Sequence, residues 1–391
     1  MCDRLVNWAN LNSFTGNLLG LDRQHAALKE AFTELGGTIR SLEVAPQQVV
    51  EADGKVSARP LGKAISVIKR PQIRPRVFLG IHMDTVYAAD HPFQQASLID
   101  ENCLGGPGVA DAKGGLVVLL GALAAFERSP MAARLGWEVL INPDEEIASA
   151  GSKSLLHEAA ARNDLGLVFE PSLPDGKLIG ARKGSGNFAV VVHGRCAHAG
   201  RHFEDGRNAI HVLAEAILKL ERLNGQRPDL TVNVGKVEGG GPVNVVPDLA
   251  ITWLNSRVAN DADQRFVEGQ LQQIVADINQ HNGFRAELHG EFTAVPKPMT
   301  DSLETLLGHL RDCGHEIGLE VEWESSGGVC DGNRLAAAGL TNVDTLGVVG
   351  GNLHSPKEYV LLESLPERTK LTALLLMKLA DGSISWPIRS L

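Results

Sequence analysis

The sequence contains little cysteine, and its few cysteines form no recognisable pattern. Five are scattered over 391 residues, and no two have CxxC spacing: Cys2, Cys103, Cys196, Cys313 and Cys330. An odd number of widely spaced thiols is atypical of a disulfide framework and of a zinc site made of thiolates. The cysteine content therefore favours a protein of a reducing compartment.

Long apolar runs are also missing. The longest stretch, "KGGLVVLLGALAAFERS", is too short to span a bilayer and is better explained as a buried helix. The N-terminal "MCDRLVNWANLNSFTG" carries acidic and polar residues where a signal peptide needs an apolar run. We therefore expect a cytoplasmic protein that does not bind membranes.

The sequence has fewer basic than acidic residues. The chain has 37 Lys and Arg against 47 Asp and Glu, a formal net charge of −10. This balance argues against a surface for nucleic acids or anionic membranes, and it leaves acids available for metal binding. Hydrophobic residues make up 43% of the chain, which is enough for the cores of two or three domains.

Strand-like and helix-like segments alternate in the first half of the chain. Strand-like runs occur at 76–81, 137–142 and 165–169, and helix-like segments occur at 22–37, 113–127 and 152–163. This alternation predicts an α/β fold, with a mostly parallel sheet covered by helices.

The pattern changes near residue 184. Segments then follow in the order β-α-β-β-α-β, at 187–194, 205–223, 230–239, 248–258, 261–283 and 284–290. This is the order of a ferredoxin-like unit. The α/β pattern returns with a helix at 301–317, a strand at 343–349 and a final helix from 364. We predict a large domain of residues 1–183 and 292–391, into which a small α+β domain, 184–291, is inserted.

Residues of metal-ligand type follow the predicted strands of the large domain. His82 and Asp84 come after 76–81, Glu145 and Glu146 after 137–142, Glu170 after 165–169 and His354 after 343–349, while Asp111 precedes the helix at 113–127. In open α/β sheets, ligands bind outside the carboxyl ends of the strands. Singly, each has an ordinary explanation, such as a helix N-cap for Asp111 or surface turns for "PDEE" and Glu170. Their joint placement predicts a metal centre.

The types of these residues indicate which metals are bound. Two histidines with three or four carboxylates fit Zn²⁺, Mn²⁺ or Co²⁺. One catalytic zinc takes fewer ligands, so the set suits two ions about 3.5–4 Å apart that share a carboxylate. Asp84 can accept the second ring N–H of His82 and fix its tautomer. If residues 143–146 are extended, Glu145 and Glu146 project to opposite sides, and only one of them binds metal.

Six segments carry a resemblance to a known family: "HMDTV", "GPGVADAKGG", "NPDEEIASAGS", "FEPS", "HGRCAHAG" and "GGNLHSPKEYV". Over residues 82–360 the chain resembles the co-catalytic zinc peptidases and amidohydrolases, which include carboxypeptidase G, succinyl-diaminopimelate desuccinylase, acetylornithine deacetylase and aminoacylase-1. The spacing is most similar to the carboxypeptidase G branch. The resemblance implies a catalytic α/β domain interrupted by a ferredoxin-like lid, through which the chain forms a homodimer.

The resemblance also implies a role for each candidate ligand. Two divalent ions per subunit, most commonly zinc but also cobalt or manganese, would be held as follows: His82 and Glu170 on one ion, Glu146 and His354 on the other, and Asp111 between them, with a cis peptide to Ala112. Glu145 would be the general base that takes a proton from the water between the metals, so that hydroxide attacks the amide. Asp84 would support His82.

Further positions are implied for the substrate. His198 in "RCAHAG" would come from the partner's lid and polarise the scissile carbonyl, and Asn244 and Arg257 would hold the substrate's carbonyl and carboxylate. The loop of Gly327 and Gly328 would line the pocket. The segment "GEFTAVPKPMT" has Val295 where the branch often has Arg, so Lys297 is the candidate substitute, although Lys lacks the bidentate fork of Arg.

The function implied is hydrolysis of the amide bond of a small N-acyl amino acid or dipeptide with a free carboxylate, as in carboxypeptidase G. Deacylation of an N-acyl amino acid, as in acetylornithine deacetylase or aminoacylase-1, is an alternative that breaks the same type of bond. A phosphoesterase and a catalytically silent binding protein on the same fold are two further alternatives. The expected partners are this small substrate and a second copy of the chain.

Overall fold

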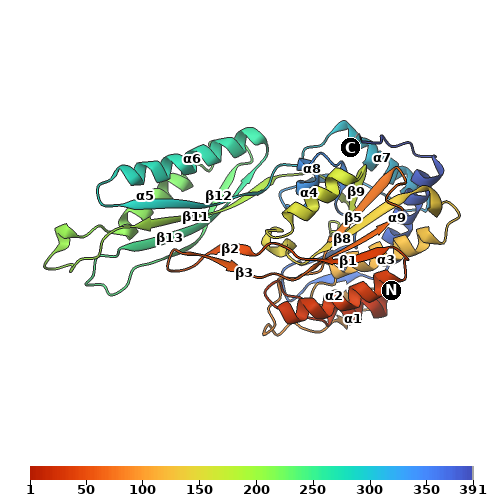
Figure 1. The fold of residues 1–391 in the computed structure, drawn as a ribbon, viewed down its shortest axis with the longest axis horizontal. Helices are drawn as coiled ribbons and strands as arrows, with labels where there is room; N and C mark the ends of the chain where they lie inside the picture. Colours follow the sequence, from red (N-terminus) through yellow and green to blue (C-terminus); the bar gives the residue numbers. More distant parts are fainter. Residues whose placement is uncertain (390–391) are drawn as a thin grey trace.

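The computed structural model describes residues 1–389 and contains two units (Figure 1). The larger unit is built on a six-stranded sheet, and the smaller unit, at left in Figure 1, on a four-stranded sheet. The chain leaves the larger unit near residue 183 and returns to it near residue 295. Met1 and Arg389, the first and last described residues, both lie on the larger unit.

The large sheet is mostly parallel. Its strands, in spatial order, are β1 (Thr38–Leu42), β4 (Ala64–Lys69), β8 (Gly136–Asn142), β5 (Arg76–His82), β9 (Leu165–Val168) and β16 (Asn342–Val343). The pairs β8–β5, β5–β9 and β9–β16 are parallel, whereas the pairs β1–β4 and β4–β8 are antiparallel. β5 and β8 are buried along their whole length, which explains their continuous apolar sequences. The predicted α/β fold class is confirmed.

Helices cover both faces of this sheet because successive side chains of a strand point to opposite faces. On one face, Val77 and Leu79 share a core with α1 (Cys2–Ala9), α2 (Leu18–Thr33), α3 (Lys113–Glu127), α7 (Asp301–Glu316) and α9 (Ser364–Asp381). On the other face, Phe78 packs in a smaller cluster with α4 (Lys153–Arg162) and α8 (Asp331–Ala337). None of the helices within residues 1–389 is long and apolar enough to cross a membrane.

Smaller elements surround the sheet. One four-stranded sheet has the order β17 (Gly350–Gly351), β18 (Tyr359–Leu361), β7 (Cys103–Gly105) and β6 (Ser97–Leu98); β10 (Leu178–Arg182) pairs with β15 (Trp323–Ser326) and β2 (Gln47–Val50) with β3 (Val56–Arg59). Three 3₁₀ turns are η1 (Ala132–Arg134), η2 (Glu145–Ile147) and η3 (Phe203–Asp205). The β2–β3 hairpin extends from the larger unit toward the smaller one (Figure 1).

The smaller unit follows the predicted order β-α-β-β-α-β. It consists of β11 (Gly184–His193), α5 (Ala209–Glu221), β12 (Thr231–Gly239), β13 (Leu249–Val258), α6 (Asp261–Gln280) and β14 (Arg285–Ala294). The four strands form one antiparallel sheet in the order β12-β13-β11-β14. Its hydrophobic cluster takes every buried member from residues 188–286. The exact boundaries, 184–291, stay a prediction.

The prediction of a strand at 343–349 is wrong for most of that segment. Of the segment 343–349, only Val343 belongs to a strand, β16. The next two side chains are buried and polar: Asp344 forms ion pairs with Arg182 and Lys297, and the Thr345 hydroxyl accepts a hydrogen bond from the Ile179 N–H at 2.8 Å. These bonds to neighbouring segments turn the chain out of the sheet, which the apolar pattern of "VDTLGVV" did not reveal.

Candidate metal centre

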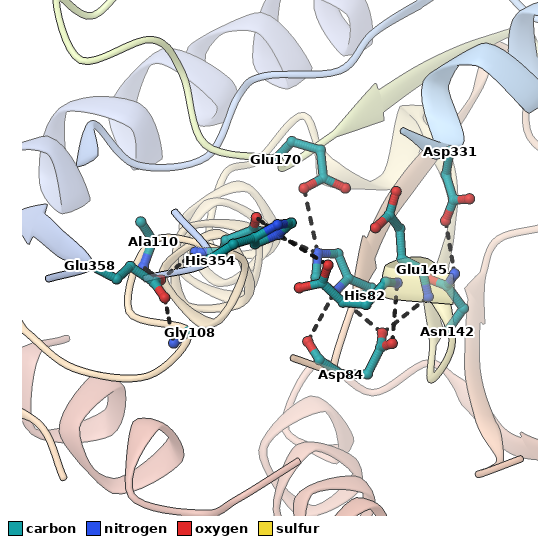
Figure 2. A network of polar contacts seen from close by, with 12 residues as sticks. His82, Asp84, Gly108, Ala110, Asn142, Glu145, Glu170, Asp331, His354 and Glu358 are labelled. Carbon is teal, nitrogen blue, oxygen red and sulfur yellow. Dashed lines mark hydrogen bonds and ion pairs between the residues drawn. The ribbon is translucent and has the colours of Figure 1, made fainter. Parts of the chain in front are cut away.

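His82 ends β5 with a completely buried side chain. Its Nδ1 lies 3.0 Å from the backbone oxygen of Asp84 and 3.3 Å from Oδ1 of the same residue. Its Nε2 points the other way, 3.0 Å from Asp111 Oδ1 and 3.5 Å from Glu170 Oε2 (Figure 2). The contacts of Nδ1 hold the ring so that Nε2 faces two carboxylates that come from different elements.

The Asp84 carboxylate connects His82 to the turn that follows β8. It accepts hydrogen bonds from the Glu145 N–H at 3.1 Å, the Glu146 N–H at 3.2 Å and the Thr15 hydroxyl at 2.7 Å. Asp84 is fully buried, and these three donors satisfy its oxygens. The supporting role of the Asp84 carboxylate toward His82 stays a prediction; in the structure the carboxylate fixes the backbone of two further candidate residues.

The segment 143–146 is not extended, so the condition on which Glu145 and Glu146 were to project to opposite sides is not met. Glu145 and Glu146 begin the 3₁₀ turn η2, which is closed by the left-handed backbone of Ala148, at φ 64°. The turn is held by Asp144, whose Oδ2 accepts from the N–H groups of Gly151 at 2.6 Å and Ser152 at 3.1 Å. Asp144 therefore has a structural role, bonded to the backbone of the residues that follow the turn.

Asp111 lies between the two candidate histidines. Its Oδ1 is 3.0 Å from His82 Nε2, and its Oδ2 is 3.4 Å from His354 Nε2. It does not cap α3, because the N-cap position is Ala112 and carries no side-chain bond. The peptide between Asp111 and Ala112 is cis, as expected.

The two glutamates at the centre each have an oxygen without a partner. Glu146 Oε2 lies 3.1 Å from His354 Nε2, and Glu170 Oε2 lies 3.5 Å from His82 Nε2. Glu146 Oε1 and Glu170 Oε1 are buried and have no hydrogen-bond partner among residues 1–389. Because buried carboxylate oxygens are normally paired, these two suggest a missing cation. Glu170 is only 7% exposed, which excludes a surface turn.

The electrostatics of the cluster indicate a need for positive charge. Burial, with Asp111 nearby, raises the pKa of Glu146 to about 7, and burial also raises the pKa of Glu170. Hydrogen bonds to Asp111 and Glu146 raise the pKa of His354 to about 10. Single ligand atoms of His82, Asp111 and Glu146 lie within 4.8 Å of one another. Divalent cations fit this donor set, because they supply the charge that the carboxylates otherwise take from protons.

Glu145 is half-buried beside this cluster (Figure 2). Burial and the neighbouring Glu170 raise the pKa of its carboxyl well above the usual range. A further buried carboxylate, Asp331 at the start of α8, accepts a hydrogen bond from the Asn142 amide at 2.8 Å and also raises the pKa of Glu145. The sequence analysis missed Asp331, which is recognisable only once α8 is placed against the end of β8.

The candidate substrate residues lie in two places. His198 and Asn244 are exposed and lie close together on the smaller unit, where the Ala199 N–H donates to the Asn244 backbone oxygen at 3.0 Å. Within residues 1–389, no hydrogen bond or ion pair joins His198 to the cluster. Arg257 on β13 reaches toward the glycine-rich loop, with Nη1 3.5 Å from the Gly327 oxygen, and Gly328 beside it is exposed.

Lys297 is not available to bind a substrate carboxylate. It is 2% exposed, and its Nζ donates to Asp344 Oδ2 at 2.7 Å. Arg182 also donates to Asp344, through Nε and Nη2, both at 2.9 Å. The expectation that Lys297 substitutes for the missing arginine is therefore wrong. Its sequence position near Val295 gave no indication of the distant Asp344.

Comparisons with known proteins agree with this geometry. The family model described as peptidase family M20/M25/M40 matches residues 78–378. Carboxypeptidase G2 of Pseudomonas sp. (strain RS-16) is 28% identical, over 97% of this chain and 89% of the relative. Succinyl-diaminopimelate desuccinylase of Pseudomonas syringae pv. syringae (strain B728a) is 31% identical, over 72% of this chain and 76% of the relative.

The fold is shared with solved structures. A dinuclear metal-binding peptidase from family M20 of Bacillus subtilis superposes with a TM-score of 0.65 at 18% sequence identity, over 97% of this chain and 98% of that protein. The superposition covers both units, so the α/β unit and the inserted unit occur together in that protein as they do here.

Proposed function

Because this chain belongs to peptidase family M20/M25/M40, and is therefore a metallopeptidase or amidohydrolase, we propose that it hydrolyses the amide bond of a small N-acyl amino acid or dipeptide with a free carboxylate. The observation that carries this proposal is the pair of buried, unpartnered oxygens of Glu146 and Glu170 beside two histidines. Amide hydrolysis suits such a site, since two adjacent cations can serve both the attacking water and the carbonyl oxygen.

The cluster divides into two sets of ligands around one shared carboxylate. The proposed assignment is His82 and Glu170 for one ion, Glu146 and His354 for the other, and Asp111 for both, in keeping with its contacts to both histidines. When bound, two divalent ions lower the pKa of water toward about 7 and polarise a carbonyl oxygen. Zinc is the first candidate, with cobalt and manganese as alternatives.

Glu145 is proposed as the general base. Its side chain lies next to the cluster, and its backbone N–H donates to Asp84 at 3.1 Å. As a carboxylate, this group can take a proton from water and then return it to the leaving nitrogen. Asp84 keeps both Glu145 and His82 in place, so its loss is expected to disturb both.

The substrate is proposed to contact residues of both subunits. His198 polarises the scissile carbonyl from the lid of the partner, while Asn244, Arg257 and the Gly327–Gly328 loop bind the rest of the substrate. His198 is exposed on a loop between β11 and α5, at the end of the smaller unit far from the large sheet (Figure 1). This position supports contact with a second copy of the chain in a homodimer.

A deacylase is the second candidate function. The 31% identity to a succinyl-diaminopimelate desuccinylase favours it, and an N-acyl amino acid presents the same amide bond with a free carboxylate. A panel of N-acyl amino acids and dipeptides, each assayed with Zn²⁺, Co²⁺ or Mn²⁺, separates the candidates by relative kcat/KM. Phosphoester turnover without amide turnover would overturn both.

Removal of divalent metal should abolish amide hydrolysis. A chelator followed by desalting is expected to leave protein without metal and without turnover, because the buried carboxylates then lack their cations. Added Zn²⁺, Co²⁺ or Mn²⁺ should restore turnover as two ions bind per chain, measured by elemental analysis beside the assay. Full turnover by protein shown to be free of metal would contradict the two-metal proposal and favour a different reaction.

Loss of His198 should reduce turnover by about 10²–10³-fold, as for other donors to an oxyanion. His198→Ala and Glu145→Gln chains are each expected to be nearly inactive, yet a mixture should regain about one quarter of wild-type activity, because half of randomly formed dimers carry one intact site. The control is His202→Ala, an exposed histidine in the same loop. Mixing without any recovery of activity would show that His198 does not act across the dimer.

A further inference from the structure

Glu358 is a buried carboxylate that is bonded to the loop that carries Asp111. It is 1% exposed. Its Oε1 accepts hydrogen bonds from the N–H groups of Ala110 at 2.9 Å and Asp111 at 3.0 Å, and its Oε2 accepts one from Gly108 at 3.1 Å (Figure 2). Three donors within four residues of a single loop thus converge on one side chain, so the conformation of that loop depends on Glu358.

The same carboxylate is connected to the segment that carries His354. The Tyr87 hydroxyl lies 2.6 Å from Glu358 Oε2 and 2.9 Å from the backbone oxygen of Ser355, which directly follows His354. Glu358 itself lies only four residues after His354 in the chain. Asp111 and His354 are distant in sequence, and Glu358 with Tyr87 links their two segments directly.

These contacts position the loop that carries Asp111 more than they stabilise the fold. The two segments are also held together by β7 and β18, through the pairs Tyr359 with Gly105 and Val360 with Leu104, which do not involve the Glu358 side chain. A loss of the Glu358 contacts should therefore shift the Asp111 loop without separating the segments. The Tyr87 bond, at 2.6 Å, has the short length typical of a hydroxyl that donates to a carboxylate, which suits precise placement.

We propose that Glu358, assisted by Tyr87, is a positioning residue that sets the distance between Asp111 and His354 and thereby the affinity for the ion that these two residues bind together with Glu146. The inference rests on the proposed two-metal centre. It predicts an unequal effect, in which the ion of His354 is weakened more than the ion of His82 and Glu170, because only the former uses both linked segments.

The test is a Glu358→Gln variant, which keeps the shape of the side chain but turns an amide N–H₂ toward the donors of Gly108 and Tyr87. One of the two ions should bind about 10–100-fold more weakly, as is typical when a group that supports a metal ligand is lost. Competition against a chelator, with Zn²⁺ and with Co²⁺, measures the two affinities separately. The metal-free variant should melt close to the metal-free wild type.

A matched control is Glu363→Gln, which makes the same chemical change five positions further along the chain at an exposed residue. It should bind both ions with wild-type affinity. Tyr87→Phe keeps the ring contacts with His91 and Phe93 and removes only the hydroxyl, so it should weaken the same ion by a smaller factor. If Glu358→Gln does not fold, Tyr87→Phe tests the same positioning role.

The possible results distinguish the positioning role of Glu358 from the two-metal centre on which it rests. Wild-type affinity for both ions in Glu358→Gln would overturn the role of Glu358 while leaving the metal centre in place. Equal weakening of both ions together with a lower melting temperature of the metal-free protein would also overturn it, since that pattern indicates a general structural role. A wild-type chain that binds no divalent ion would overturn the metal centre itself.

Discussion

Glu145→Gln should lower kcat by about 10²–10⁴-fold, the range that general acid–base catalysis contributes, while the protein keeps two metal ions per chain. Gln has the same shape but cannot accept the proton of the attacking water or return it to the leaving nitrogen. The backbone N–H of residue 145 would still donate to Asp84, so the turn should remain in place. The assay is steady-state kinetics at saturating metal, beside elemental analysis.

The adjacent residue supplies the matched control. Glu146→Gln replaces a proposed ligand that lies 3.1 Å from His354 Nε2, and it should therefore lose one metal ion along with activity. The two variants differ by one position and carry the same chemical change. We nevertheless expect two ions per chain in Glu145→Gln and one ion per chain in Glu146→Gln. A Glu145→Gln enzyme with kcat within a few-fold of wild type would contradict the assignment of Glu145 as the general base. Loss of metal from Glu145→Gln would also contradict it.

The sequence predicted those elements whose signal is local. β5 and β8 are buried on both faces, so their apolar runs were recognisable, and α3 occupies the predicted residues 113–127. β1 was missed because it is partly exposed and reads "TIRSL", without a clear alternation. The β2–β3 hairpin likewise has no fully buried residue. Such strands are defined by their pairing partners rather than by their own composition.

The same distinction applies to the site. His82 and Glu170 follow buried strands directly, and topology brings the ends of those strands together, so their proximity was predictable. Glu358 was not, because it acts through backbone N–H groups about 250 positions earlier in the chain, and no spacing reveals such donors. The turn at Glu145 was not predicted, since the bonds of Asp144 that bend the chain there depend on tertiary placement.

Asp344 illustrates what a buried charge contributes once it is paired. It is fully buried and accepts hydrogen bonds from Arg182 and Lys297, which are also buried. Burial alone would raise the pKa of Asp344, but the two cations outweigh this effect and hold it at about 2. Relative to the usual value near 3.9 in an unfolded chain, this difference corresponds to about 2–3 kcal/mol of stability at neutral pH.

The pH dependence follows from the direction of this shift. Because the folded-state pKa is lower than the unfolded one, the contribution is fully present above about pH 4 and is lost as the pH falls toward about 2. Urea unfolding of wild-type protein across this window should show a decline in the free energy of unfolding that an Asp344→Asn variant lacks. Asp175→Asn, an exposed carboxylate, serves as the control and should follow wild type.

At neutral pH, Asp344→Asn should reduce the free energy of unfolding by about 3–5 kcal/mol, since it leaves two buried cations without a counter-charge. Lys297→Met should cost much less, because Arg182 and Asp344 remain as a balanced bidentate pair and the methionine side chain fills similar space. This inequality distinguishes a charge effect from a packing effect. Equal losses in the two variants would contradict the electrostatic explanation and indicate that packing around residue 297 holds this junction together.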